Sequence, residues 1–134
     1  MYNSTKQIMR LNAGILTEKL QETRAFYVDL LEFTVTFENE FYLLLRTPNG
    51  EDALSFLLPN HPTQDPLFHA PFNGQGVYLT LEVDDVTYWY EKLKAKSIEI
   101  KVALRKEPWG DHHFAVQCPN GIGIDYVTYI SPRA

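Results

Sequence analysis

Four side chains in the second half of the sequence could act together in acid–base or metal chemistry. They are Glu82, the adjacent pair His112 and His113, and Asp125. Carboxylates and imidazoles are the common protein ligands of divalent ions, and an open metal site needs about three of them. Adjacent side chains on a strand point to opposite faces. At most one of the two histidines can therefore share a cavity with Glu82 and Asp125.

Other residues of the same region favour binding of an organic molecule. Tyr78 and Thr80 point away from the apolar face of an alternating strand, so they line a cavity, or else face water or a partner subunit. Trp109 follows a proline in a loop, where its ring either closes over a ligand or packs into the core. Asp125 alternates with bulky neighbours, and its carboxylate needs a ligand amine, an arginine, water or a structural network as partner.

The composition is that of an ordinary globular protein and excludes several classes of function. The chain has 134 residues, of which 45% are hydrophobic and 22% charged. Its net charge of −5 comes without a basic block, which disfavours nucleic acid because phosphate contacts dominate that kind of binding. No apolar run is long enough for a signal peptide or a membrane span, and Cys118 is the only cysteine. We therefore expect a cytoplasmic protein without an intrachain disulfide or a membrane partner.

The elements that position these residues occur twice in the same order. Hydrophobic periodicity predicts, in each half, a strand, a helix and three further strands. The first set covers residues 11–16, 18–31, 33–38, 41–46 and 53–58, and the second set covers residues 77–83, 86–96, 98–104, 112–117 and 122–130.

A repeated Pro-Asn-Gly turn supports a duplication. The turn occurs at residues 48–50 and 119–121, an offset of 71 (119 − 48), each time before a predicted strand. In the predicted helices an offset of 66 residues aligns Leu20 with Val86 and Tyr27 with Leu93, so the apolar faces of the two helices correspond. The five extra residues of the second unit fall in the loop 105–111. We predict one domain over residues 1–134, with unit one at about 8–58, a proline-rich connection at 59–76 and unit two at about 77–130.

Paired βαβββ units in a chain of this length resemble the vicinal oxygen chelate superfamily, which includes glyoxalase I, bleomycin- and fosfomycin-resistance proteins and extradiol dioxygenases. Two segments carry the resemblance: Ala25–Phe33 looks like the family's "FY...LGF" helix end, and Pro108–Asp125 looks like its "PWG...F...DPDGN.IEL" ending. The resemblance implies an α+β fold in which two βαβββ units form a curved mixed-sheet half-barrel. It also implies helices on the convex face and a ligand on the concave face.

The resemblance also implies a metal position, which this sequence does not fill. The family's enzymes take ligands from the first and last strands of each unit. The corresponding residues here are Asn12, Leu54 or Ser55, Tyr78 and Asp125, and only Asp125 is a good ligand. By this resemblance to the bleomycin-resistance branch, we expect metal-independent binding of a small organic molecule, such as a toxic or antibiotic compound, in a homodimer without cofactor.

The expected ligand contacts come from both units. Tyr78, Thr80, Trp109 and Phe114 would supply apolar contact, and Asn12 and Asp125 would supply polar anchors. Two alternatives stay open. One is a metal-dependent lyase or ring-cleaving dioxygenase that uses Glu82, Asp125 and either His112 or His113. The other is a structural or regulatory dimer that binds no small ligand.

Overall fold

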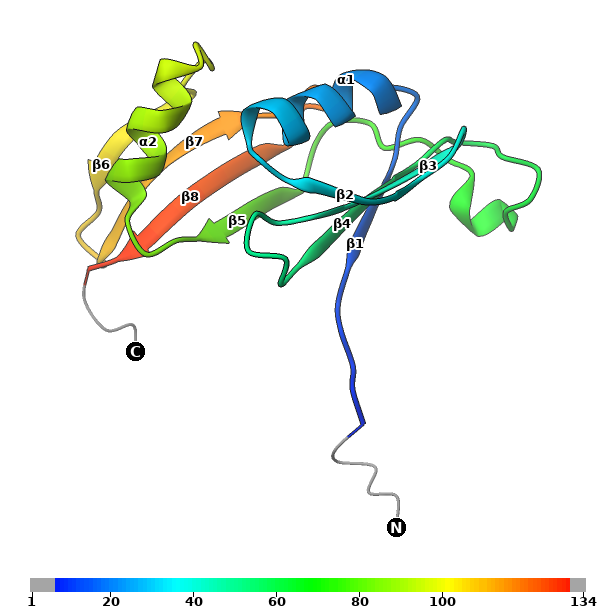
Figure 1. Ribbon diagram of the computed structural model, residues 1–134, viewed down its shortest axis with the longest axis horizontal. Helices are drawn as coiled ribbons and strands as arrows, with labels where there is room; N and C mark the ends of the chain where they lie inside the picture. The colour runs from blue at the N-terminus through cyan, green and yellow to red at the C-terminus, as the bar shows by residue number, and fades with distance from the viewer. Residues whose placement is uncertain (1–6, 131–134) are drawn as a thin grey trace.

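Two four-stranded sheets, each with a helix on one face, make up the chain. The structure is a computed structural model that describes residues 7–130 (Figure 1). The strand orders are β1-β4-β3-β2 and β5-β8-β7-β6. The first sheet and its helix comprise β1 (Ala13–Leu16), α1 (Leu20–Arg24), η2 (Ala25–Leu30), β2 (Thr34–Glu38), β3 (Tyr42–Arg46) and β4 (Ala53–Leu57). The second comprise β5 (Tyr78–Glu82), α2 (Val86–Ala95), β6 (Val102–Lys106), β7 (Asp111–Gln117) and β8 (Gly123–Tyr129).

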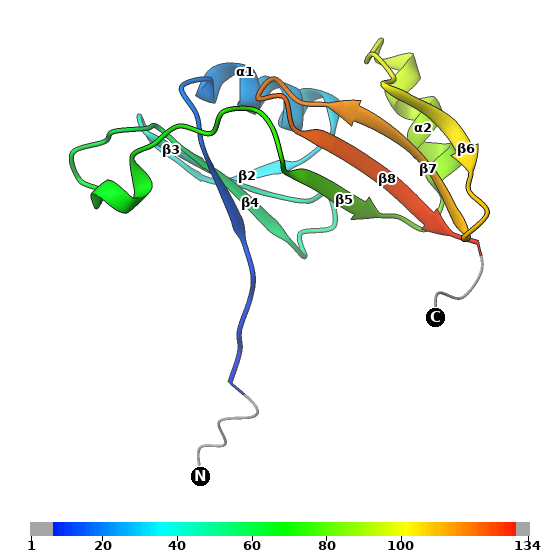
Figure 2. The same cartoon turned by 180° about the vertical axis from the view of Figure 1, so that it is seen from behind.

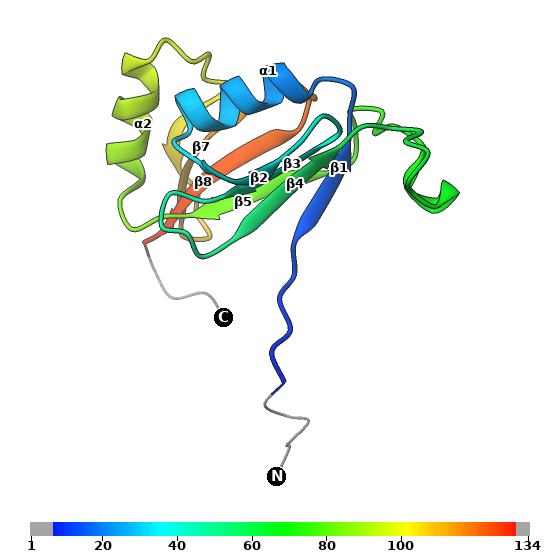
Figure 3. The ribbon, with the colours of Figure 1, turned by 45° about the vertical axis from the view of Figure 1, so that its right-hand side comes forward.

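Both sheets are mixed in the same way. The first strand of each unit runs parallel to the last, β1 to β4 and β5 to β8, and the remaining pairs are antiparallel. Helices α1 and α2 lie on the same side of the two curved sheets, and neither covers the other side (Figure 3). The predicted α+β fold of two βαβββ units with helices on one face is therefore confirmed. No helix within residues 7–130 is long and apolar enough to cross a membrane.

Strand register settles which residue of unit one corresponds to Asp125. Leu54 in β4 and Ile124 in β8 are buried on the helix-covered side, and they pair with Ala13 and Leu79. One position further along, Gly14 pairs with Ser55 where Thr80 pairs with Asp125. Ser55, not Leu54, therefore occupies the position of Asp125 in unit one.

The core lies between the sheets and the helices. Tyr27 and Leu93, which the repeat offset superposes, are both fully buried. In unit two the Phe114 and Tyr126 rings are stacked with centroids 4.9 Å apart, and Trp89 from α2 stacks on Tyr126 at 5.9 Å. Such aromatic contacts stabilise the fold in addition to the stabilisation from the large apolar area that each ring removes from water.

Helix α2 forms where the sequence predicts it. Asp85 precedes the helix, and its side chain accepts a hydrogen bond from the Tyr88 N–H, which satisfies one of the unpaired donors of the first turn. Val86 and Leu93 are buried against the sheet. The following strand begins later than predicted, because residues 96–101 first leave the helix and β6 starts only at Val102.

The two units are joined at both ends of the first helix. At its C-terminal end, Lys96 Nζ donates to the carbonyls of Asp29 and Leu30 and to Glu32, and Lys92 Nζ lies 2.7 Å from the Glu32 carboxylate. A cation at a helix C-terminus is favourable because the last carbonyls have no partner in the helix. The hydrogen bond from Lys92, aided by Lys96, lowers the pKa of Glu32.

At the N-terminal end, Asn120 from the second Pro-Asn-Gly turn bridges to unit one. The Thr17 hydroxyl donates to Asn120 Oδ1 at 2.6 Å, and Asn120 Nδ2 donates to the Thr23 hydroxyl at 2.9 Å. Lys19 Nζ also donates to the Pro119 carbonyl. Both threonines are buried, so their hydroxyls depend on these protein partners.

Asn120→Ala should destabilise the chain by about 1–3 kcal/mol, because it removes both hydrogen bonds to buried hydroxyls. Urea unfolding followed by circular dichroism measures the loss. Asn49→Ala is the matched control, since Asn49 is the same residue of the first turn but is exposed and bonds only within that turn. An equal loss in the two variants would contradict a bridging role for Asn120.

Candidate functional site

One face of the second sheet gathers polar side chains from three strands, and we call it the open face. It carries Tyr78, Thr80, Glu82, His113 and Asp125. The register places them together: Thr80 pairs with Asp125, and Glu82 and His113 both pair with Val127, two residues further along β8. Their neighbours in sequence point to the helices, as the alternation of a strand requires. Figure 2 shows this sheet from behind, with β8 between β5 and β7.

His113 lies between two carboxylates on this face. Its Nδ1 is 2.8 Å from Asp125 Oδ1, and its Nε2 is 2.8 Å from Glu107 Oε2. Arg105 forms an ion pair with Glu107 at 2.7 Å. The His113 and Glu107 side chains are 16% and 8% exposed. Both carboxylates can accept from the ring only when the imidazole is protonated, so these two contacts favour its positively charged form. We call Glu107, His113 and Asp125 the His113 cluster.

The contacts in the cluster shift the pKa values of His113 and Glu107. Burial by itself lowers the pKa of His113, but hydrogen bonds to Glu107 and Asp125 outweigh it, so the pKa of His113 is raised. The pKa of Glu107 is lowered, chiefly by its hydrogen bond with Arg105 and then by that with His113. Each charge in the cluster is therefore neutralised by a direct partner.

The same geometry opposes a metal site of the kind considered above. Both ring nitrogens of His113 already face carboxylates, and His112 lies on the helix-covered face. The Glu82 carboxylate accepts a hydrogen bond from the Tyr129 hydroxyl at 2.9 Å. Within residues 7–130, no group of three or more His, Cys, Asp or Glu side chains is placed to hold a metal ion. The donor set of Glu82, Asp125 and either histidine does not fit a divalent ion.

The structure brings together only part of the expected ligand site. Tyr78 is 73% exposed and Thr80 is exposed beside Asp125 on the open face. Trp109 is 61% exposed at the tip of the β6–β7 hairpin. Asn12 is exposed in the segment before β1, at the position of unit one that corresponds to Tyr78.

Phe114 requires a correction. It was expected to contact a ligand, but it is fully buried and stacks on Tyr126 on the helix-covered side. Its neighbour His113 takes the open face, and two adjacent strand residues cannot share one. Phe114 therefore belongs to the core.

Glu107 and Arg105 were not singled out from the sequence, although they complete the cluster. A usable signal was present: they are two positions apart at the end of a strand, so their side chains share a face. Arg105 also pairs with His113 in the β6–β7 register, which carries that face to the histidine.

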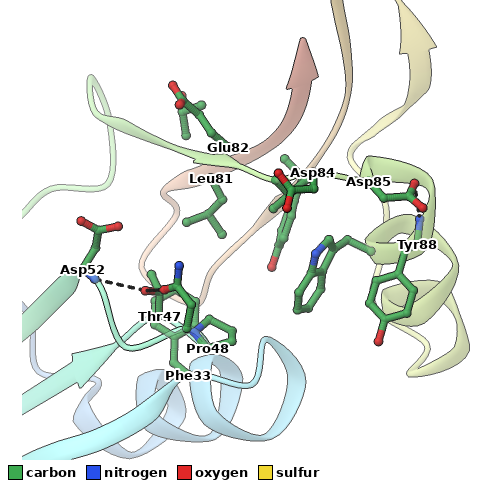
Figure 4. A pocket seen from close by; sticks show the side chains of 14 residues that line it. Phe33, Thr47, Pro48, Asp52, Leu81, Glu82, Asp84, Asp85 and Tyr88 are labelled. Atoms are coloured by element: carbon green, nitrogen blue, oxygen red, sulfur yellow. Dashed lines mark hydrogen bonds between the residues drawn. The ribbon is translucent and has the colours of Figure 1, made fainter. Parts of the chain in front are cut away.

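A separate cavity of about 750 Å³ lies between the two units, on the helix side of the sheets (Figure 4). Of the expected ligand set, only Thr80 borders this cavity, and its side chain lies on the open face beside Asp125.

The raised pKa of His113 predicts a pH-dependent stability. The charged ring stabilises the folded state fully below the unfolded pKa of about 6.5, and the contribution is lost as pH rises through the folded pKa. His113→Gln should therefore lose unfolding free energy at pH 6 relative to the parent protein, and the deficit should shrink by pH 9. An NMR titration should place the His113 pKa above 6.5 and lower in Asp125→Asn; a value at or below 6.5 would contradict the cluster.

Comparison with known proteins supports the fold. No curated protein matches the sequence of the chain. Among solved structures, the chain is similar to TnmS3, an antibiotic binding protein from Streptomyces sp. CB03234, with 17% identity over 92% of this chain and 98% of that one and a TM-score of 0.71. It is similar to a bleomycin-binding protein complexed with bleomycin (22% identity, 90% and 98% coverage, TM-score 0.67). It is also similar to a lactoylglutathione lyase from Agrobacterium tumefaciens (18%, 92% and 93%, TM-score 0.72).

The family match covers most of the sequence. The family model described as Glyoxalase/Bleomycin resistance protein/Dioxygenase superfamily matches residues 8–126. This range includes every strand and helix described above except the last three residues of β8. The chain belongs to the Glyoxalase/Bleomycin resistance protein/Dioxygenase superfamily.

Proposed function

We propose that this chain binds a small organic molecule on its open face without a metal ion, and that it sequesters a toxic or antibiotic compound. The observation that carries the proposal is the exposure of two large aromatic side chains, Tyr78 and Trp109, in the half of the chain that holds the His113 cluster. Aromatic rings supply flat apolar contact, and a few polar groups fix the orientation of a ligand.

The named neighbours agree with this class of function. One is an antibiotic binding protein and another holds bleomycin. Another neighbour is a lyase, which supports the alternative that this chain is an enzyme. We favour binding because His113 is already paired with Asp125 and Glu107, and Glu82 accepts from Tyr129. Among residues 7–130 no group of three such side chains is placed to hold a metal ion.

We further propose that the protein is a homodimer. Residues 7–12 extend away from both sheets (Figures 1 and 2), and Ile8, Met9 and Leu11 are 78%, 95% and 94% exposed. Three such aliphatic side chains in a row of six residues are costly in water. A second copy is the partner that fits, because a two-fold axis would let each arm cover the apolar surface of the other chain.

Ligand binding is tested with bleomycin as the first probe and a panel of aromatic antibiotics after it. A ligand that binds only the folded state raises its melting temperature. Tyr78→Ala and Trp109→Ala should each weaken binding about tenfold in isothermal titration calorimetry, as expected for aromatic anchors. Phe37→Ala is the control, since Phe37 is 52% exposed on β2 in the other unit. If no compound raises the melting temperature, a structural or regulatory dimer is favoured instead.

Metal independence is tested separately. Elemental analysis of purified protein should find no stoichiometric divalent ion, and EDTA treatment should leave the affinity for the identified ligand unchanged. A stoichiometric metal that Asp125→Asn loses would overturn the binding-only proposal and support the lyase or dioxygenase alternative.

The dimer is tested by charging the arm. Met9→Asp combined with Leu11→Asp should convert the dimer to a monomer in sedimentation velocity, because a buried carboxylate without a partner is strongly unfavourable. Leu67→Asp is the matched control, since Leu67 is 77% exposed in the short helix η3 (Pro66–Phe68) of the connection. A parent protein that stays monomeric at high concentration would contradict the proposal.

A further inference from the structure

The two units meet at two junctions that the duplication makes equivalent, and only one of them is closed. In the closed junction, the second Pro-Asn-Gly turn lies against the start of helix α1, where Asn120 bonds to Thr17 and Thr23. The equivalent junction would bring the first turn, with Asn49, against the start of helix α2.

Sequence differences account for the open junction. The helix offset of 66 places Val83 on Thr17 (17 + 66) and Trp89 on Thr23 (23 + 66). Neither replacement offers a hydroxyl to the Asn49 amide. Asn49 Oδ1 instead accepts from the Thr47 hydroxyl at 2.7 Å and from the Glu51 N–H at 3.1 Å, within its own turn. The two sides therefore stay apart, and the cavity of about 750 Å³ lies between them.

The base of this cavity is aromatic. Phe33 and Tyr126 are 4% and 2% exposed, and Trp89 stacks on Tyr126. Tyr88 meets Trp89 edge to face at 5.5 Å and is 54% exposed. Figure 4 shows Phe33 and the first turn on one side of the cavity and Tyr88 on helix α2 at the other. The volume lies within the usual range for sites that enclose drug-sized ligands, about 300–1,000 Å³.

The rim of the cavity is acidic. The residues that border it include four acidic ones and no Lys, Arg or His. They are Asp52, Glu82, Asp84 and Asp85. Asp85 caps helix α2, and the Glu82 carboxylate lies on the open face and accepts from Tyr129. The carboxylates of Asp52 and Asp84 have no hydrogen-bond or ion-pair partner among residues 7–130. These two, from opposite sides of the cavity, remain available to a cation.

A cation already contacts the same rings from outside the cavity. Lys92 Nζ lies 5.2 Å from the Tyr88 centroid and 5.3 Å from the Trp89 centroid, while its charge is neutralised by Glu32. Ring faces at this distance attract cations through the aromatic quadrupole. Aromatic walls and unpaired carboxylates together match an ammonium group on a flat apolar body.

We propose that the cavity between the units is a binding site for an organic cation, and that it is separate from the open face. The ligand class is an aryl or arylalkyl ammonium compound, with its ring against Trp89 and Tyr126 and its nitrogen between Asp52 and Asp84. This site does not depend on the function proposed for the open face, and either one can fail without the other.

The test compares three soluble probes of one shape that differ in charge. They are 2-phenylethylammonium, 2-phenylethanol and phenylacetate. In two-dimensional NMR titrations the ammonium should give saturable shifts at the Trp89 indole and the Asp52 and Asp84 amides, bind at least tenfold tighter than the alcohol, and weaken with added salt. Phenylacetate should not saturate, because the rim repels it.

Variants separate this site from the other. Asp52→Asn with Asp84→Asn should weaken the ammonium at least tenfold and leave the alcohol unchanged, and Tyr88→Ala should weaken both. All three positions are exposed, so the fold should persist, as circular dichroism can check. Asp125→Asn and Tyr78→Ala are the controls on the open face and should have no effect. Equal binding of the three probes, shifts confined to the open face, or no saturable shift would each overturn the proposal.

Discussion

The stacked pair Phe114 and Tyr126 fixes what the second sheet can present to a ligand. Both rings are buried against helix α2, and a strand has only two faces. Their neighbours His113 and Asp125 must therefore point to the open face, where they meet each other at 2.8 Å. The polar cluster is thus a consequence of the core, and a change that turned either strand over would bury one of its members, His113 or Asp125.

The cluster in turn limits the chemistry of the open face. A protonated histidine between two carboxylates donates from both nitrogens, and in that form it offers no lone pair to a metal or to a substrate proton. Arg105 balances the second carboxylate, which leaves the group with little net charge. A ligand on this face would meet the exposed ring of Tyr78, and Trp109 is exposed in the hairpin that leads into β7. The binding proposal therefore rests on aromatic contact more than on charge.

The sequence was sufficient for the architecture because its signals are local. Alternation in residues 77–83, the helix stripe from Val86 to Leu93 and two Pro-Asn-Gly turns each depend on near neighbours. Prediction of the site requires the register between strands, which is not a local signal. The contact of His113 with Glu107 depends on the register of β6 against β7, which includes an irregularity between Val102 and Arg105. Periodicity does not reveal such a shift. The same limit left Leu54 and Ser55 undecided until the β1–β4 pairing was known.

The position of Phe114 could have been predicted from the sequence, because the alternation of side chains along a strand places it on the face opposite His113. A residue next to His113 cannot share its face, yet an aromatic near a Pro-Trp-Gly loop is easily taken as a ligand contact. The difference between the two junctions of the units, by contrast, appears only when equivalent residues are compared across the duplication. At the closed junction Asn120 bonds to Thr17 and Thr23. At the other junction the equivalent residues are Val83 and Trp89, which have no hydroxyl for Asn49, and the cavity lies there. In this duplicated fold one junction is held by hydrogen bonds, and the other, which has no hydroxyls at the equivalent positions, borders an aromatic cavity.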